Sequence, residues 1–163
     1  MTPEETIDFH IRWAWAKISK AYNIEAAKFG GTMSIGYVLL NIDKEGTPST
    51  KLGPKMGMEP TSLSRLLKKM EEDDLIRKEA DTDDKRIVKI FLTKKGKEMR
   101  EPSKSAVIKL NNYFREHIPL KKLEVFLEVM QSINGTLENP DVFAESASKT
   151  KKKSTTQNRS IKN

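Results

Sequence analysis

Apolar residues recur at intervals of three and four along most of the chain, which is the spacing of one face of an α-helix. Between Pro3 and Phe29, no proline or glycine interrupts this pattern. The apolar positions of this segment are Ile7, Ile11, Ala14, Trp15, Ile18, Ala21 and Tyr22. We therefore expect a long amphipathic helix, which the glycine pair at positions 30–31 ends.

Two shorter helices are predicted next. Ser34 has a typical N-cap side chain and precedes an apolar run that continues to Ile42. A Gly-Thr-Pro turn closes that helix. Ser49 or Thr50 can then cap a third, short helix, which Gly57 ends.

The fourth helix is the best defined by its pattern. It begins near Pro60, an early position that favours proline, and runs to about Asp73. One apolar stripe is formed by Leu63, Leu66, Leu67 and Met70. The runs 75–80 and 86–92 then have strand-forming residues, and the polar segment 81–85 between them is typical of a turn. We expect a two-stranded hairpin.

The last helices follow the hairpin directly. Thr93 is placed to cap a fifth helix, in which we expect Pro102 to introduce a kink. Pro119 opens a sixth helix that runs to Leu137. The expected fold class is therefore mainly α with a small β-hairpin. Residues 140–163 are rich in Ser, Thr and Lys with little to bury, so a basic, disordered tail is predicted there.

Composition narrows the function classes. The net charge is +7, but six of the 30 basic residues and none of the 23 acidic residues lie in 146–163, which leaves +1 for the rest. The charge of the whole chain is thus weak evidence for nucleic-acid binding by the folded part. Cysteine is absent, which excludes disulfides and thiol chemistry, and two histidines offer little material for a metal cluster. No apolar run approaches the roughly 20 residues of a membrane span.

The order of a short helix, a tight turn, a capped helix and a basic hairpin is typical of a winged helix-turn-helix. The face opposite the apolar stripe of the fourth helix is polar. It carries Thr61, Arg65, Lys68 and Glu72, with Lys69 beside them and Ser62 and Ser64 flanking them. Such a face suits the major groove, since Arg bonds bidentately to guanine and Lys neutralises phosphate. The helix alone favours the alternative, the solvated face of an ordinary surface helix. The hairpin that follows the helix makes DNA binding the favoured interpretation of this face.

Four motifs stand in a characteristic order. They are Thr-Ser-Leu-Ser-Arg-Leu-Leu-Lys-Lys-Met-Glu-Glu at 61–72, Leu-Ile-Arg at 75–77, Asp-Thr-Asp-Asp-Lys-Arg at 81–86 and Leu-Thr-Lys-Lys-Gly at 92–96. With them, the sequence over roughly 5–137 resembles the MarR (multiple antibiotic resistance regulator) family of winged-helix transcription factors. Asp74 departs from the family pattern, which usually has Gly there, and Gly53-Pro54 replaces an Ala-containing pair.

The resemblance implies a domain organisation and a role for the hairpin tip. One domain is expected over 1–139, with the winged helix-turn-helix at about 34–98 and flanking N- and C-terminal dimerisation helices. Lys85 corresponds to the wing position that the family uses to reach the minor groove, where narrow A·T-rich DNA attracts a cation. The alternative interpretation of Lys85 is a surface lysine without a DNA contact.

Other charged residues of the hairpin have structural explanations. Arg86 lies beside three aspartates, so bracing of the hairpin is favoured over phosphate contact, and Arg77 is treated in the same way. Asp81 and Asp84 are interpreted as turn formers and arginine partners rather than as catalytic or metal-binding carboxylates. No nucleophile, base and orienting group converge, so no enzyme, metal site or cofactor is expected.

The flanking helices carry more apolar surface than a small domain can bury, and a homodimer is expected to cover it. A single, larger monomeric core is the alternative. MarR-like proteins commonly bind small aromatic ligands near the dimerisation helices. The candidates here are His10, Trp13, Met33 and Tyr37, although core packing explains each of them as well.

The sequence therefore predicts a homodimeric, sequence-specific DNA-binding transcriptional regulator of the cytosol. We expect this regulator to bind double-stranded DNA at a pseudo-palindromic operator and to act as a repressor that a small-molecule effector modulates. No membrane partner is expected. The alternative function is a winged-helix protein that makes protein contacts or binds DNA without sequence preference.

Overall fold

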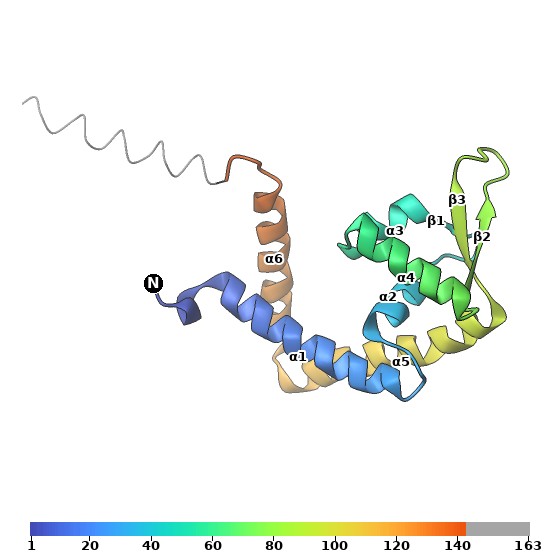
Figure 1. The fold of residues 1–163 in the computed structure, drawn as a ribbon. Coiled ribbons are helices and arrows are strands. Elements are labelled where there is room, and N and C mark those ends of the chain that lie inside the picture. Colours follow the sequence, from blue (N-terminus) through green and yellow to red (C-terminus); the bar gives the residue numbers. More distant parts are fainter. Residues whose placement is uncertain (143–163) are drawn as a thin grey trace, which may run out of the picture. The chain divides into compact units, whose positions relative to one another are not determined.

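A computed structural model describes residues 1–142 and divides the chain into two compact units (Figure 1). The first unit is Met1–Asn112 and the second is Tyr113–Asn163. Most of the predicted tail, positions 143–163, lies outside the described residues. Helix α5 (Lys94–His117) is continuous through Pro102, and α6 (Leu120–Leu137) follows it with Pro119 as its N-cap residue.

The first unit begins with a short 3-10 helix, η1 (Pro3–Glu5), and the long helix α1 (Ile7–Ala27). The predicted single helix from Pro3 is interrupted because Thr6 has an extended backbone, with φ −93° and ψ 145°. Gly30 has φ +71°, a left-handed conformation that glycine adopts without strain. As predicted, the glycine pair ends the helix.

Helix α2 (Met33–Asn41) follows at once, but its N-cap differs from the predicted one. The hydroxyl of Thr32, not that of Ser34, accepts the hydrogen bond from the Ile35 backbone N–H at 3.3 Å. Ser34 already lies inside the first turn. Threonine and serine stand two residues apart, and the sequence pattern did not distinguish between them.

Helices α3 (Ser49–Met56) and α4 (Pro60–Glu72) are joined by a tight turn. Gly57 makes this turn with φ +60°. The prediction that Ser49 or Thr50 caps α3 is wrong, because Pro48 is the N-cap residue and both hydroxyl residues lie within the helix. The bounds of α4 agree with the prediction to one residue.

The sheet has one strand more than predicted. Strands β2 (Ile76–Ala80) and β3 (Val88–Leu92) form the expected antiparallel hairpin. A short strand, β1 (Thr47–Pro48), pairs with the other edge of β3, which gives the order β1-β3-β2. The sequence pattern missed β1 because two residues show no alternation, and Pro is confined to such strand edges.

The core of the first unit lies between α2, α3, α4 and the sheet. Its buried apolar residues are Ile35, Val38, Leu39, Ile42, Leu52, Leu63, Leu67, Met70, Leu75, Ile76, Ile90 and Leu92. Three of them, Leu63, Leu67 and Met70, belong to the predicted stripe of α4. In Figure 1, α4 lies beside α3, and the β2–β3 hairpin extends beyond both helices.

A tight junction links α4 to the hairpin and to α5. Asp74 has φ +57°, a left-handed conformation, at the position where the family pattern usually has Gly. The Thr93 hydroxyl donates to the Asp74 carbonyl oxygen at 2.6 Å and accepts the Gly96 N–H at 3.0 Å, as the predicted cap of α5. A Cβ added to Gly96 would lie 2.0 Å from the carbonyl oxygen of Leu75.

Substitution Gly96→Ala is expected to lower the free energy of unfolding by about 1–3 kcal/mol, the usual cost of overpacking. The reason is that the new Cβ meets backbone, which cannot rotate away. Urea unfolding followed by circular dichroism measures the change. Gly135→Ala in α6 is the control, because a Cβ there meets nothing within 4 Å and should be neutral or stabilising. Equal stability of Gly96→Ala and the parent would contradict the close contact.

Substitution Asp74→Gly is expected to raise the free energy of unfolding by about 1 kcal/mol, because it relieves a left-handed non-glycine residue. Asp74→Ala should lower it, since alanine tolerates this conformation less well than aspartate. Both values come from the same urea titrations. If alanine proved as favourable as glycine, strain at this position would not explain the result.

Candidate nucleic-acid interface

The polar face of α4 is exposed, as the sequence predicted. The predicted DNA-contacting residues of this helix are all exposed to solvent, namely Thr61, Ser62, Ser64, Arg65, Lys68 and Lys69. They are held in this position because the opposite side of α4 packs into the core through Leu63, Leu67 and Met70. The helix thus presents a fixed row of hydroxyl and basic groups.

The hydroxyl groups lie in the first half of α4. Ser64 Oγ donates to the Pro60 carbonyl oxygen at 2.9 Å, so its proton is engaged and its lone pairs stay available as acceptors. Thr61 and Ser62 belong to the first turn, where backbone N–H groups have no acceptor within the helix. Such N–H groups suit an anionic oxygen.

The basic groups of α4 differ in their surroundings. Lys68 Nζ lies 3.9 Å from Glu72 Oε1, and Lys69 Nζ lies 3.2 Å from Asp73 Oδ2. Both pairs join residues four apart on the exposed surface. Arg65 makes no ion pair with any residue from 1 to 142. The pattern placed Glu72 on this face, but it did not predict that the lysines would be paired.

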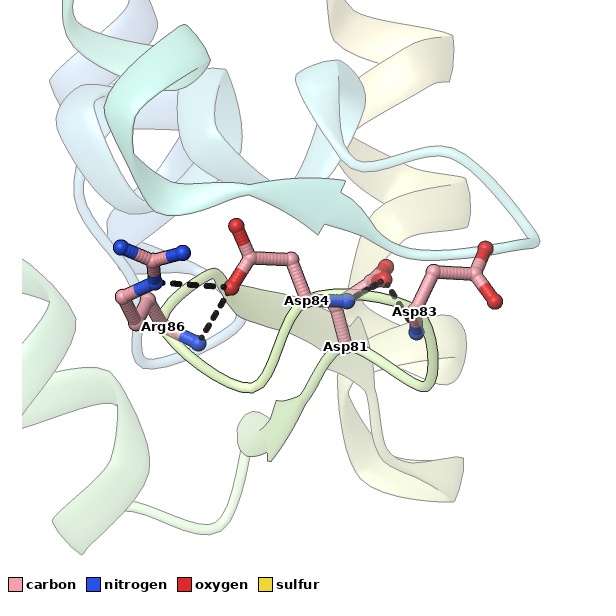
Figure 2. Close-up of polar contacts among 4 residues, drawn as sticks. All are labelled: Asp81, Asp83, Asp84 and Arg86. Carbon is pink, nitrogen blue, oxygen red and sulfur yellow. Dashed lines mark hydrogen bonds and ion pairs between the residues drawn. The ribbon is translucent and has the colours of Figure 1, made fainter.

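The β2–β3 hairpin forms the wing, and its turn is held by backbone and side-chain hydrogen bonds (Figure 2). Asp81 N–H donates to the Ile87 carbonyl oxygen at 2.8 Å, and Ile87 N–H donates to that of Asp84 at 2.9 Å. Asp81 Oδ1 accepts the backbone N–H groups of Asp83 and Asp84 at 2.9 and 3.2 Å. Lys85, at the tip, is exposed, and no ion pair joins it to the described part of the chain.

The arginine and aspartate pairing in the wing differs from the prediction. Arg86 contacts Asp84 alone of the three aspartates, with Nε 3.3 Å from Oδ1, and its side chain stays 93% exposed. Asp81 pairs instead with Lys89 on β3, an ion pair that was not predicted from the sequence. The Lys89 ammonium lowers the pKa of Asp81 to about 2, and the N–H groups of Asp83 and Asp84 contribute to the shift. The same contact raises the pKa of Lys89.

Arg77 braces the base of the wing, in line with the structural role expected for it. Its Nε lies 2.6 Å from Glu79 Oε1, and its Nη1 donates to the Leu92 carbonyl oxygen at 3.2 Å. The guanidinium also lies 4.8 Å from the centre of the Phe91 ring, its partner in the strand register. A Cβ on Gly46 would approach that ring to 2.5 Å, so Gly46 allows Phe91 to lie against the turn before β1.

Two further lysines face solvent on α3, the helix that the tight turn at Gly57 joins to α4. Lys51 and Lys55 lie one helical turn apart on α3, both exposed, and neither is ion-paired within residues 1–142. These two lysines are not among the residues predicted from the sequence. Their spacing of four, which places both side chains on one side of the helix, was the signal that could have identified them.

The four candidate ligand-binding residues do not converge within one chain. Met33 N–H donates to Asn23 Oδ1 at 3.0 Å, which places the start of α2 beside the second half of α1. His10 lies 13 residues before Asn23 on α1, or about 20 Å along the helix axis. Its Nε2 lies 2.8 Å from the Glu4 carbonyl oxygen. Trp13 and Tyr37 are exposed, at 56% and 46%.

No three or more His, Cys, Asp or Glu residues within 1–142 are grouped so that they could hold a metal ion. None of the helices described there has the length and apolar character needed to cross a membrane.

Comparison with known proteins agrees with this geometry. Residues 37–88 match the model of the MarR family. The transcriptional regulator SarZ of Staphylococcus saprophyticus is 34% identical over 87 residues, which cover 53% of this chain and 60% of SarZ. The chain thus spans less than two thirds of the length of this curated relative.

Solved structures share the fold. CouR from Rhodococcus jostii RHA1, bound to p-coumaroyl-CoA, superposes with a TM-score of 0.70 at 23% identity and covers 82% of this chain and 94% of CouR. MepR of S. aureus, in a DNA complex, gives a TM-score of 0.73 at 17% identity, covering 80% and 97%. The winged-helix segment, residues 37–88, is therefore similar to the MarR family, and about four fifths of the chain shares the fold of these solved structures.

Proposed function

We propose that the chain is a DNA-binding transcriptional regulator that inserts α4 into the major groove of an operator. One observation carries this proposal: the polar face of α4 is exposed and lies next to a projecting, braced wing. SarZ is named a transcriptional regulator, and MepR and CouR have each been solved with DNA. An α-helix of this kind fits the width of the major groove.

The proposed contacts divide between bases and phosphates. Arg65 is the residue of α4 best suited to a bidentate bond with guanine. Thr61, Ser62 and Ser64 supply hydroxyl groups at the start of the helix, where recognition helices approach the bases. Lys68 and Lys69 contact phosphates, while Lys85 and Arg86 reach the minor groove and the backbone beside it. The wing positions these last two groups because its turn is held by Asp81.

A homodimer is proposed to cover the apolar residues of the long helices. None of the residues of α1 or α6 is buried in the single chain, although both helices carry large apolar side chains. Trp13 and Trp15 of α1 and Phe126 of α6 are each more than half exposed. A second copy offers the same apolar residues in return, as two-fold symmetry requires. Two copies of α4 would then lie about 34–36 Å apart, one turn of DNA.

A small-molecule effector is proposed to act on this regulator. CouR has been solved with a small ligand bound, p-coumaroyl-CoA. In this chain, Met33 and Tyr37 are the two candidate residues that one site can include, together with Tyr22. Burial raises the pKa of the Tyr22 phenol, and the nearby Tyr37 adds to the shift. An effector regulates only if it prefers one spacing of the two α4 helices.

We further propose repression as the outcome, because a dimer that covers an operator keeps other proteins from that DNA. CouR is described as a transcriptional repressor. The alternative is a winged-helix protein that binds DNA without sequence preference or makes protein contacts. Only the first function requires a preferred sequence at fixed salt concentration.

Selection of bound sequences from random DNA tests the proposal. We expect a two-fold symmetric site with half-sites one helical turn apart. Arg65→Ala should relax the preference at one position of each half-site, where a bidentate pair discriminates by about 1–3 kcal/mol. Lys68→Ala should weaken all sequences about equally. A protein that enriches no sequence, or equal losses for both variants at every site, would contradict these roles.

The wing offers a separate prediction at Asp81. Asp81→Asn keeps an oxygen for the two backbone N–H groups but loses the ion pair with Lys89, so the wing should loosen and operator affinity should fall by about two- to fivefold. Because the pKa of Asp81 is lowered in the folded state, its contribution to stability is present above about pH 4 and disappears as the pH falls to about 2. Melting temperatures between pH 2 and 5 should therefore fall more for the parent than for Asp81→Asn.

Asp83→Asn is the matched control, because it removes an aspartate charge from the same turn, and that side chain accepts none of the turn's bonds (Figure 2). It should retain the pH dependence of the parent. A loss of pH dependence in this control equal to that in Asp81→Asn would show that total wing charge, rather than the Asp81–Lys89 pair, governs stability.

A further inference from the structure

Four carboxylates lie at and just beyond the end of α4, whose DNA-facing part carries three cations. Glu71, Glu72, Asp73 and Asp74 follow one another, and only Met70 separates them from Lys68 and Lys69. Two of them hold the lysines one turn earlier, at 3.9 Å for Lys68–Glu72 and 3.2 Å for Lys69–Asp73. A third, Glu71, holds Lys78 of the wing at 2.5 Å. The helix thus neutralises its own lysines.

Helix stability does not explain this acidic end. The C-terminus of a helix has partial negative charge, so cations stabilise it and carboxylates destabilise it. A cation already stabilises the C-terminal end of α4, since Lys95 Nζ donates to the Asp73 carbonyl oxygen at 2.7 Å. The carboxylate groups of Glu72 and Asp73 therefore work against the helix dipole, and exposed ion pairs return little.

The position of Glu72 points instead to DNA. Glu72 stands seven residues after Arg65, nearly two full turns, so both side chains lie on the same face as Lys68. Arg65 has no carboxylate three or four residues away in either direction, whereas each of the two lysines has two. The face proposed to contact DNA therefore has an unpaired cation in its first half and self-paired lysines in its second half.

We propose that Glu72 and Asp73 compete with DNA phosphate for Lys68 and Lys69 and so limit sequence-independent binding. The proposal rests on the DNA-binding function proposed above. A phosphate that recruits either lysine must displace a carboxylate and leave that negative charge beside the DNA. Affinity that comes from releasing counterions is reduced, because fewer phosphates are neutralised. Arg65 carries no such penalty, so its base contact keeps its full strength.

Salt titrations with Glu72→Gln and Asp73→Asn test the proposal. Binding to a random-sequence duplex is measured from 50 to 200 mM salt with the full chain. Each substitution should tighten binding about two- to fivefold at the lower salt concentration. The slope of log affinity against log salt should steepen by about 0.9 for each lysine that gains a phosphate. Base preferences of the parent should be retained.

The chain offers a matched control in α1. Asp8 and Arg12 form an exposed pair with the same four-residue spacing, at 3.7 Å. Asp8→Asn makes the same change in net charge and frees a cation outside α4, so it should leave both affinity and slope close to those of the parent. Lys68→Ala combined with Glu72→Gln should remove the gain of Glu72→Gln, because the released lysine carries it.

The outcomes separate this proposal from the proposed function. A parent that binds no duplex overturns the function and the inference together. A parent that binds DNA, with Glu72→Gln and Asp73→Asn unchanged in affinity and slope, overturns the inference alone. An equal gain in DNA affinity from Asp8→Asn also overturns the inference, because it would show that the net charge of the chain, and not the release of Lys68 or Lys69, sets the affinity. A changed base preference with an unchanged slope overturns it as well, and assigns Glu72 a base contact.

Discussion

The burial of one side of α4 is the constraint on which the interface depends. Leu63, Leu67 and Met70 pack into a core shared with α2, α3 and the sheet, so the helix cannot rotate without exposing them. Burying such side chains is worth about 1.5–3 kcal/mol each. The direction of Arg65 and its polar neighbours is therefore set by apolar packing on the far side of the helix, not by any contact they make themselves.

The junction after α4 transmits this constraint to the wing. Asp74 turns the chain through a left-handed conformation, and the Leu75 carbonyl packs where only a glycine at position 96 leaves room. Thr93 joins both sides of the junction through its hydroxyl. Because β2, β3 and the start of α5 meet here, the position of the wing relative to α4 is fixed by backbone contacts.

Charge is distributed over these elements in a way that composition does not reveal. Asp81 neutralises Lys89 inside the wing, and Glu72 and Asp73 neutralise lysines on α4. In the described part of the chain, Arg65 and Lys85 are left without such partners. These two side chains stand on the two elements that the proposed function brings to DNA, one on the helix and one at the tip of the wing.

Local sequence patterns were enough to predict α4, the β2–β3 hairpin, the Thr93 cap and the outward face with Arg65. Periodicity, turn residues and caps depend on neighbours in the chain, and a sequence contains that information directly. The pairing of Asp81 with Lys89 and the third strand, β1, depend on residues that only folding brings together. Tertiary structure alone decided these, because the choice among several nearby aspartates and lysines is made by strand register and side-chain reach.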